Sequence, residues 1–277
     1  TVFLKHLGAN KLATTSTGID VTGTAVTDGL TVAGNVSVDG GTIKLDGNYP
    51  VGTGNVALGD TALGDASLSG ANNVAVGTAA LSANTTGFEN VAVGRISLNL
   101  NTTGYYNTAI GSQALDANTS GLSNSSLGYA SLGANTTGSY NTALGSYALI
   151  SNTTASSNTA VGYQAGYANT TGADLTAIGY QALDANTTGN YSTAVGYSAL
   201  GANTTGSANE AFGREALRLN TTGSNNTALG YRTLDVNTSG GSNVAVGQFA
   251  LGNNTTASNN TAVGYQAGYS NTTGTQN

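Results

Sequence analysis

The chain has no cysteine, methionine or tryptophan, and proline occurs once among its 277 residues. Without cysteine it can form neither a disulfide framework nor a thiolate metal site. Charged residues are scarce at 7%, and a net charge of −6 argues against a nucleic-acid partner, which would need basic patches. No apolar run is long enough to span a bilayer. The composition therefore predicts neither nucleic-acid binding nor a membrane span.

The residues that dominate instead are asparagine, threonine, glycine, alanine and serine, with 41 glycines in all. Disordered chains usually combine high charge with few apolar residues. Here charge is scarce, and valine, leucine, isoleucine and alanine recur at fixed positions. The sequence therefore predicts an ordered chain.

A seventeen-residue unit repeats without insertion or deletion. Twelve copies run from Asn73 to Gln276, with the consensus N-T-A-V-G-Y-x-A-L-x-A-N-T-T-G-S-x. Such a strict period indicates one supersecondary unit stacked on copies of itself. The fifth position is glycine in every copy, which gives the ladder Gly77, Gly94, Gly111, Gly128, Gly145, Gly162, Gly179, Gly196, Gly213, Gly230, Gly247 and Gly264.

The unit fits a strand better than a helix, because glycine and the N-T-T-G cluster would repeatedly weaken a helix. In N-T-A-V-G-Y, the second, fourth and sixth positions share one face of a strand, and the first, third and fifth share the other. We expect a second short strand over A-L-x-A and then a turn at N-T-T-G, where glycine can adopt positive φ. The sequence predicts an all-β fold, a parallel β-solenoid whose coils rise about 4.8 Å each.

The fourth position is always Val, Ile, Leu or Phe, and the ninth is Leu except at Gly166 and Gly268. We expect these side chains to fill the interior, and the asparagine of N-T-T-G to face outward. One thin coil buries little apolar surface, so the stabilisation from burial is small compared with the conformational entropy that the coil loses on folding. The alanine and glycine face of the first strand is therefore predicted to pack against sister chains in a homotrimer.

Three segments are predicted along the chain. Residues 1–54 alternate short apolar runs with Gly, Asp and Asn, which indicates an irregular β-rich segment for a shaft or attachment. Residues 55–72 form an imperfect copy of eighteen residues, interpreted as a transition or capping coil, and residues 73–277 are the solenoid repeats. Pro50 is expected to mark the boundary. Because the chain starts at Thr1 and stops at Asn277, both ends look like cuts in a longer polypeptide.

The NTAVGYQAL…NTTG units, together with KLATTSTGIDVTG at residues 11–23 and TDGLTVAGNVSVDG at 27–40, resemble bacteriophage tail-fibre and surface-fibre proteins, particularly marine ones. Related fibres carry an endosialidase-type intramolecular chaperone domain after such repeats. The resemblance implies a β-rich, usually trimeric fibre on a virion or cell surface that positions a receptor-binding tip. This sequence shows neither the chaperone domain nor the tip. The N-T-A-V-G core is also similar to the head repeats of trimeric autotransporter adhesins, which have a shorter period.

Catalytic groups are few. His6 is the only histidine and has no partner motif. Acidic residues at the tenth position, Asp116, Asp184 and Asp235, lie four and three coils apart, about 14–19 Å, which is too far for the carboxylate pair of a glycosidase. We interpret them as solvated loop charges. The calcium-binding nonapeptide G-G-x-G-x-D is absent from the sequence, so no repeated metal site and no cofactor are expected.

Two rows of repeated residues, one of threonine and one of tyrosine, allow alternative functional interpretations. The threonine ranks at Thr85, Thr102 and Thr119 suggest an ice-binding face, but adjacent threonines in a turn do not form the flat array that such a face needs. Tyrosines at the sixth position could stack on sugars, although covering the rod or contacting a neighbouring chain is the favoured interpretation. These tyrosines are Tyr129, Tyr163, Tyr180, Tyr197, Tyr231 and Tyr265.

Each N-T-T or N-T-S tripeptide is also a glycosylation sequon. The favoured interpretation is an asparagine ladder that closes the turn, because a turn favours asparagine there in any case. The twelve sequon asparagines are Asn84, Asn101, Asn118, Asn135, Asn152, Asn169, Asn186, Asn203, Asn220, Asn237, Asn254 and Asn271.

Taken together, these patterns favour a non-enzymatic structural protein of an extracellular fibre, acting as a rigid spacer and adhesive rod. Its expected partners are copies of itself, with cell-surface glycans as a further candidate. Two alternatives stay open at this point: a self-polymerising filament that carries glycans on its asparagines, and a tailspike that binds or degrades polysaccharide.

Overall fold

The computed structural model describes residues 3–6, 9–14, 19–20 and 53–277, and the chain divides into two compact units, 1–44 and 45–277. In the first unit, strands β1 (Phe3–His6), β2 (Ala9–Thr14) and β3 (Ile19–Asp20) form an antiparallel sheet in that order. These three strands are the part of the predicted β-rich segment 1–54 that lies within the described residues. Its other predicted apolar alternations and Pro50 lie outside the described residues.

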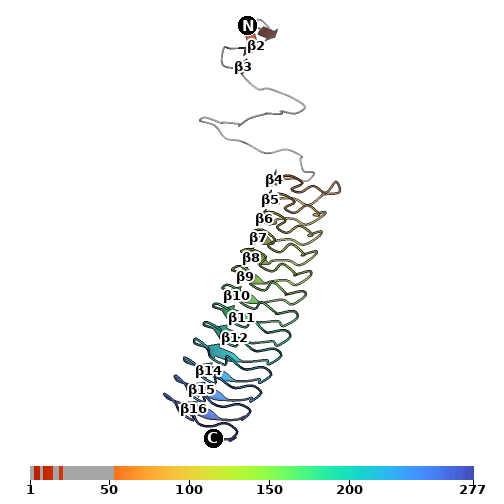
Figure 1. Ribbon diagram of the computed structural model, residues 1–277. Coiled ribbons are helices and arrows are strands. Elements are labelled where there is room, and N and C mark those ends of the chain that lie inside the picture. Colours follow the sequence, from red (N-terminus) through yellow and green to blue (C-terminus); the bar gives the residue numbers. More distant parts are fainter. Residues whose placement is uncertain (1–2, 7–8, 15–18, 21–52) are drawn as a thin grey trace. The chain divides into compact units, whose positions relative to one another are not determined.

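The second unit is a parallel β-solenoid, as predicted. Each coil contributes one strand of three residues, and each strand pairs with the strands of the neighbouring coils in a single 13-stranded parallel sheet. Figure 1 shows these strands following one another along one side of the stacked coils. The strands are β4 (Val56–Leu58), β5 (Val74–Val76), β6 (Val91–Val93), β7 (Thr108–Ile110), β8 (Ser125–Leu127), β9 (Thr142–Leu144), β10 (Thr159–Val161), β11 (Thr176–Ile178), β12 (Thr193–Val195), β13 (Glu210–Phe212), β14 (Thr227–Leu229), β15 (Val244–Val246) and β16 (Thr261–Val263).

The pairing register follows the sequence repeat. Thr159 pairs with Thr176 and Ala160 with Ala177, which places identical repeat positions beside one another. The step from Val56 to Val74 is one residue longer, so the imperfect copy at 55–72 forms a coil of the same sheet. With strands about 4.8 Å apart, the 13-stranded sheet is about 58 Å long.

The prediction of a second strand over A-L-x-A is wrong. In the coil at residues 107–123 this segment is a series of turns, and Gln113 and Leu115 have left-handed φ values of 60° and 53°. Left-handed residues reverse the chain direction, so the segment cannot extend. It still bonds to the next coil, because the backbone N–H of Leu115 donates to the carbonyl oxygen of Ser131 at 2.9 Å.

The predicted faces of the first strand are reversed. The third-position alanines, such as Ala109, are fully buried inside the coil, as are ninth-position leucines such as Leu115. The fourth-position side chain of the same coil, Ile110, points outward and is 38% exposed. The coil is thin, and a methyl group facing a leucine already fills it. The interior therefore has no room for a branched or aromatic side chain at the fourth position.

Asparagine side chains form two ladders inside the coils, so the outward orientation predicted for the N-T-T-G asparagine is also wrong. At the first position, Nδ2 of Asn90 donates to Oδ1 of Asn73 at 3.1 Å. At the twelfth, Nδ2 of Asn101 donates to Oδ1 of Asn84 at 2.8 Å. Both donors also reach one acceptor, the carbonyl oxygen of Gly104, at 2.9 Å and 3.0 Å. The two ladders thus meet at a shared backbone carbonyl, and the buried amides are satisfied.

Candidate interaction surfaces

The second- and fourth-position side chains of β4–β16 form what we call the outward sheet face. Its fourth-position row is apolar along the whole sheet, and its side chains are exposed or partly exposed; within the stack the exposed members range from 38% at Ile178 to 49% at Leu229. Strands of three residues spaced about 4.8 Å apart give this face an area on the order of 600 Å². Part of this area is polar, because threonine or serine occupies most second positions, but the apolar fourth-position row is continuous, which favours an interaction surface.

Only one charged residue, Glu210, occupies the second or fourth position of the described coils. Its carboxylate accepts a hydrogen bond from the hydroxyl of Thr227 in the next coil, at 3.3 Å. The other second-position residues are Val, Thr or Ser. The face therefore lacks the alternating charges that usually protect an exposed sheet surface from association.

Next to this face, three consecutive sixth-position tyrosines stack on one another. The ring centroids of Tyr163 and Tyr180 are 5.5 Å apart with an interplanar angle of 19°, and those of Tyr180 and Tyr197 are 5.3 Å apart with an angle of 5°. Tyr180 thus uses both ring faces on its neighbours. At Tyr180 this arrangement supports the covering role over sugar stacking, since a sugar would need a free ring face.

The tenth-position carboxylates differ from the predicted solvated loop charges. Asp116 and Asp184 are half-buried, and burial raises the pKa of each carboxyl above its ordinary value. The side chain of Asp235 is only 5% exposed. All three are followed by glycine at the tenth position of the next coil, namely Gly133, Gly201 and Gly252.

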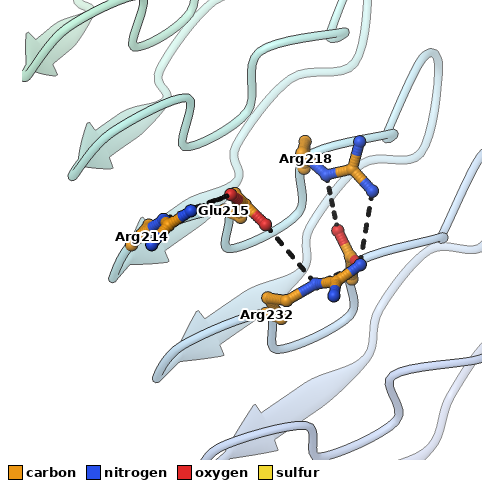
Figure 2. A network of polar contacts seen from close by, with 5 residues as sticks. Arg214, Glu215, Arg218 and Arg232 are labelled. Atoms are coloured by element: carbon orange, nitrogen blue, oxygen red, sulfur yellow. Dashed lines mark hydrogen bonds and ion pairs between the residues drawn. The ribbon is translucent and has the colours of Figure 1, made fainter.

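The Asp235 side chain is nearly buried, whereas those of its counterions Arg218 and Arg232 are 33% and 36% exposed. Figure 2 shows these arginines with the neighbouring Arg214 and Glu215. Its Oδ1 lies 2.8 Å from Nε of Arg218 in the preceding coil, and its Oδ2 lies 2.6 Å from a terminal nitrogen of Arg232. The hydrogen bond to Asp235 and its charge raise the pKa of the Arg232 guanidinium. Both carboxylate oxygens of Asp235 are thus engaged by guanidinium groups of the fold.

The network extends to Glu215, whose carboxylate lies 3.4 Å from Nε of Arg232 and 3.1 Å from a terminal nitrogen of Arg214. The guanidinium carbon of Arg214 is 5.6 Å from the ring centroids of both Tyr197 and Tyr231. These charges link neighbouring coils and rest on aromatic rings. The arrangement holds these side chains between neighbouring coils.

The threonines of the turn and the single histidine were the other candidates in the sequence. The hydroxyl of Thr85 donates to the carbonyl oxygen of Thr102 at 2.9 Å, and that of Thr102 to Thr119 at 3.0 Å. These threonines therefore support the turn instead of presenting a free hydroxyl array. His6 lies in β1. In the part of the chain that the structure describes, no three His, Cys, Asp or Glu side chains are grouped so that they could hold a metal ion.

The sequon asparagines point inward. Those from Asn84 to Asn254 are 0% exposed, and Asn271 at the end of the described stack is partly buried. Glycosylation would take place on Nδ2, and in Asn118 this atom donates to Oδ1 of Asn101 at 2.8 Å and to the carbonyl oxygen of Gly121 at 3.0 Å. The folded chain therefore favours the turn-closing interpretation over glycan attachment.

The burial of Asp116 and Asp184 predicts a pH effect on stability. Their pKa values are raised in the folded state, so the ionised forms destabilise the fold at neutral pH, and this penalty disappears as the pH falls through the folded pKa. Replacing both by asparagine is expected to raise the free energy of unfolding near pH 7 by less than about 1 kcal/mol, since both are half-exposed to screening solvent. Near pH 3, below the ordinary pKa of aspartate, wild type and variant should be equally stable in urea unfolding.

Asp65 provides the opposite control. Hydrogen bonds from the side chain and the backbone of Ser67 lower the pKa of its carboxyl. Its contribution is therefore present above the unfolded pKa and lost in acid, so Asp65→Asn should destabilise slightly at neutral pH. A gain in stability from Asp65→Asn, or none from the double variant, would contradict the assignment.

Comparison of the chain with protein-family models, curated proteins and solved structures gave no match. Within the described ranges, no helix is long and apolar enough to cross a membrane. Inferences about function therefore rest on the geometry of the solenoid and on the sequence resemblance to fibre proteins.

Proposed function

We propose that this chain is a structural, non-enzymatic segment of an extracellular fibre, in which several copies associate along their outward sheet faces. The observation that carries the proposal is the apolar fourth-position row, which runs without interruption from Leu58 to Val263. A monomeric rod would leave this row in water. Burying it against another chain removes the exposed apolar area and adds the support that one thin coil lacks.

The best occupant of this face is another copy of the same chain. Its apolar row repeats once per coil, about every 4.8 Å, and only a surface with the same rise can match it along the full length. A second solenoid supplies that rise. The low charge of the face also removes the repulsion that would keep identical copies apart. Three copies are proposed because the repeats resemble those of phage fibre proteins, which are usually trimeric.

In this assembly the chain acts as a rigid spacer and adhesive rod, placed on a virion as part of a tail fibre or on a cell surface as part of a filament. Two features support this role. The coils are uniform over a sheet of 13 strands, and their buried asparagines form ladders that join each coil to the next. Cell-surface glycans are the proposed external partner, by the same resemblance.

The absence of cysteine from the sequence allows a clean test of the association face. We expect Leu144→Cys, on the outward sheet face, to give covalently linked chains after treatment with a short thiol-reactive cross-linker. Thr154→Cys in the same coil should remain unlinked, because this exposed fourteenth-position residue lies in the turn. Linked chains from Thr154→Cys and none from Leu144→Cys would contradict the proposed face.

The tailspike alternative has a direct test as well. Glu215 and Asp235 are linked through Arg232, and both carboxylates are engaged in ion pairs. Incubation with capsular polysaccharide or lipopolysaccharide is therefore expected to release no oligosaccharide. Release that is lost in the Asp235→Asn variant would favour the tailspike over the structural role.

A further inference from the structure

Aspartate occurs at the tenth position of several coils, and its surroundings differ between Asp235 and Asp116. At Asp235 the carboxylate is paired with Arg232, at the seventh position of its own coil, and with Arg218, at the tenth position of the preceding coil. The hollow that remains there, lined by Arg232, Asp235 and Gly252, measures only 80 Å³. In this coil the fold itself supplies the cations that the carboxylate requires.

At Asp116 the same two positions carry no cation. The seventh position is Gln113, and the tenth position of the preceding coil is Asn99. The amide of Asn99 is directed elsewhere, since its Nδ2 donates to the carbonyl oxygen of Ala79 at 2.9 Å and to the hydroxyl of Ser82 at 2.7 Å. The hollow beside Asp116 is correspondingly larger, at 350 Å³.

Two tyrosine rings line this larger hollow. The ring centroids of Tyr129 and Tyr147 are 5.2 Å apart, and the rings are nearly perpendicular at 88°. The absence of a side chain at Gly133 keeps the carboxylate accessible, because a Cβ atom there would lie 3.4 Å from Oδ1 of Asp116. A half-buried carboxylate beside two electron-rich rings is the combination that attracts organic cations.

We propose that the hollow formed by Gln113, Asp116, Tyr129, Gly133, Tyr147 and Ile150 binds an organic cation, the ammonium or guanidinium group of a ligand. This group would take the place that the Arg232 guanidinium takes at Asp235. The volume of 350 Å³ lies at the lower end of small-molecule sites, which suits a small cationic group. The net charge of −6 favours the approach of cations, and a neutral sugar would leave the Asp116 charge uncompensated.

Asp184 provides a matched control within the chain. It has the same half-buried carboxylate, a glutamine at the seventh position and a glycine at the tenth position of the next coil, Gln181 and Gly201. The position that corresponds to Tyr147 is Glu215, and that corresponding to Ile150 is Arg218. Because an acid replaces one ring and a guanidinium replaces the isoleucine, both two coils further along, this turn is not expected to bind an added cation.

The test is calorimetric titration of the full chain with choline, agmatine and dimethylbutanol, the neutral carbon analogue of choline. We expect choline or agmatine to bind at least about tenfold more tightly than the neutral analogue. Tight choline binding identifies a quaternary ammonium ligand, and tight agmatine binding identifies a guanidinium. Equal binding of the neutral analogue, or binding of neither cation, would overturn the proposal.

Variants locate the site. Asp116→Asn should weaken cation binding about tenfold, whereas Asp184→Asn should leave it unchanged. Asparagine is compatible with the fold at this position, as Asn99 shows. Gln113→Arg should abolish binding by supplying the cation within the chain, as Arg232 does. Equal losses from Asp116→Asn and Asp184→Asn would show a nonspecific charge effect and overturn the assignment. The site uses no side chain of the outward sheet face, so its failure would leave the proposed association intact.

Discussion

Alanine in place of Gly179 is expected to lower the free energy of unfolding by about 2–6 kcal/mol. The φ value of Gly179 is 132°, a conformation that L residues rarely adopt. A Cβ atom there would also lie 2.5 Å from the carbonyl oxygen and 2.7 Å from the carbonyl carbon of Gly196 in the next coil. These are backbone atoms of the sheet stack, so they cannot move aside without separating two coils.

Gly201→Ala is the control, with the same added methyl group in the neighbouring coil. Gly201 does not have a left-handed φ, and its nearest neighbour would be the carbonyl oxygen of Ser198 at 3.2 Å. Other coils carry Ser82 or Asn99 at this position, so a Cβ atom fits the turn. Urea unfolding followed by circular dichroism should show less than about 1 kcal/mol of destabilisation. Similar losses from Gly179→Ala and Gly201→Ala would contradict the assigned role of the fifth-position glycine.

Three aspartates on the outward sheet face are expected to dissociate the assembly into single chains. The substitutions are Ile110→Asp, Leu144→Asp and Ile178→Asp, which place a charge in every second coil of the fourth-position row. All three side chains are exposed, so the substitutions cost little within one coil, but in the associated rod each would bury an unpaired charge. Light scattering should report a fall to the mass of one chain.

The control for this variant carries the same added charge in the same three coils. It consists of Ser120→Asp, Thr154→Asp and Thr188→Asp, at exposed fourteenth positions in the turn. Its mass should equal that of the wild type. Dissociation of both variants would indicate a general charge effect, and dissociation of neither would show that the copies do not meet on the outward sheet face.

The period of the sequence was sufficient to predict the coil, its parallel pairing and its register, because a repeat without insertions allows only in-register stacking. The alternation in N-T-A-V-G-Y also separated the two faces of the strand correctly. It could not show which face is inside. Ala109 is buried and Ile110 exposed because the distance across the coil admits only a methyl group opposite Leu115, and that distance comes from the left-handed turns at Gln113 and Leu115.

The asparagines and the tenth-position acids were harder to interpret for a related reason. An amide at Asn101 suits an exposed turn as well as a buried ladder, and only the neighbouring Asn84 and Asn118 at the same position distinguish the two. A usable signal was present for the acids. Each tenth-position aspartate is followed seventeen residues later by glycine, and Arg218 precedes Asp235 by the same interval. A comparison of residues at the same repeat position in neighbouring coils would have located the ion pair between Arg218 and Asp235.

The most direct test of the central claim is the mass of the full chain in solution, measured by sedimentation equilibrium while circular dichroism confirms intact β-structure. Association along the outward sheet face predicts a multiple of the chain mass of 27.2 kDa, and the proposed trimer predicts three times that value. A mass of 27.2 kDa with the solenoid intact would contradict the claim that copies of this chain build the fibre.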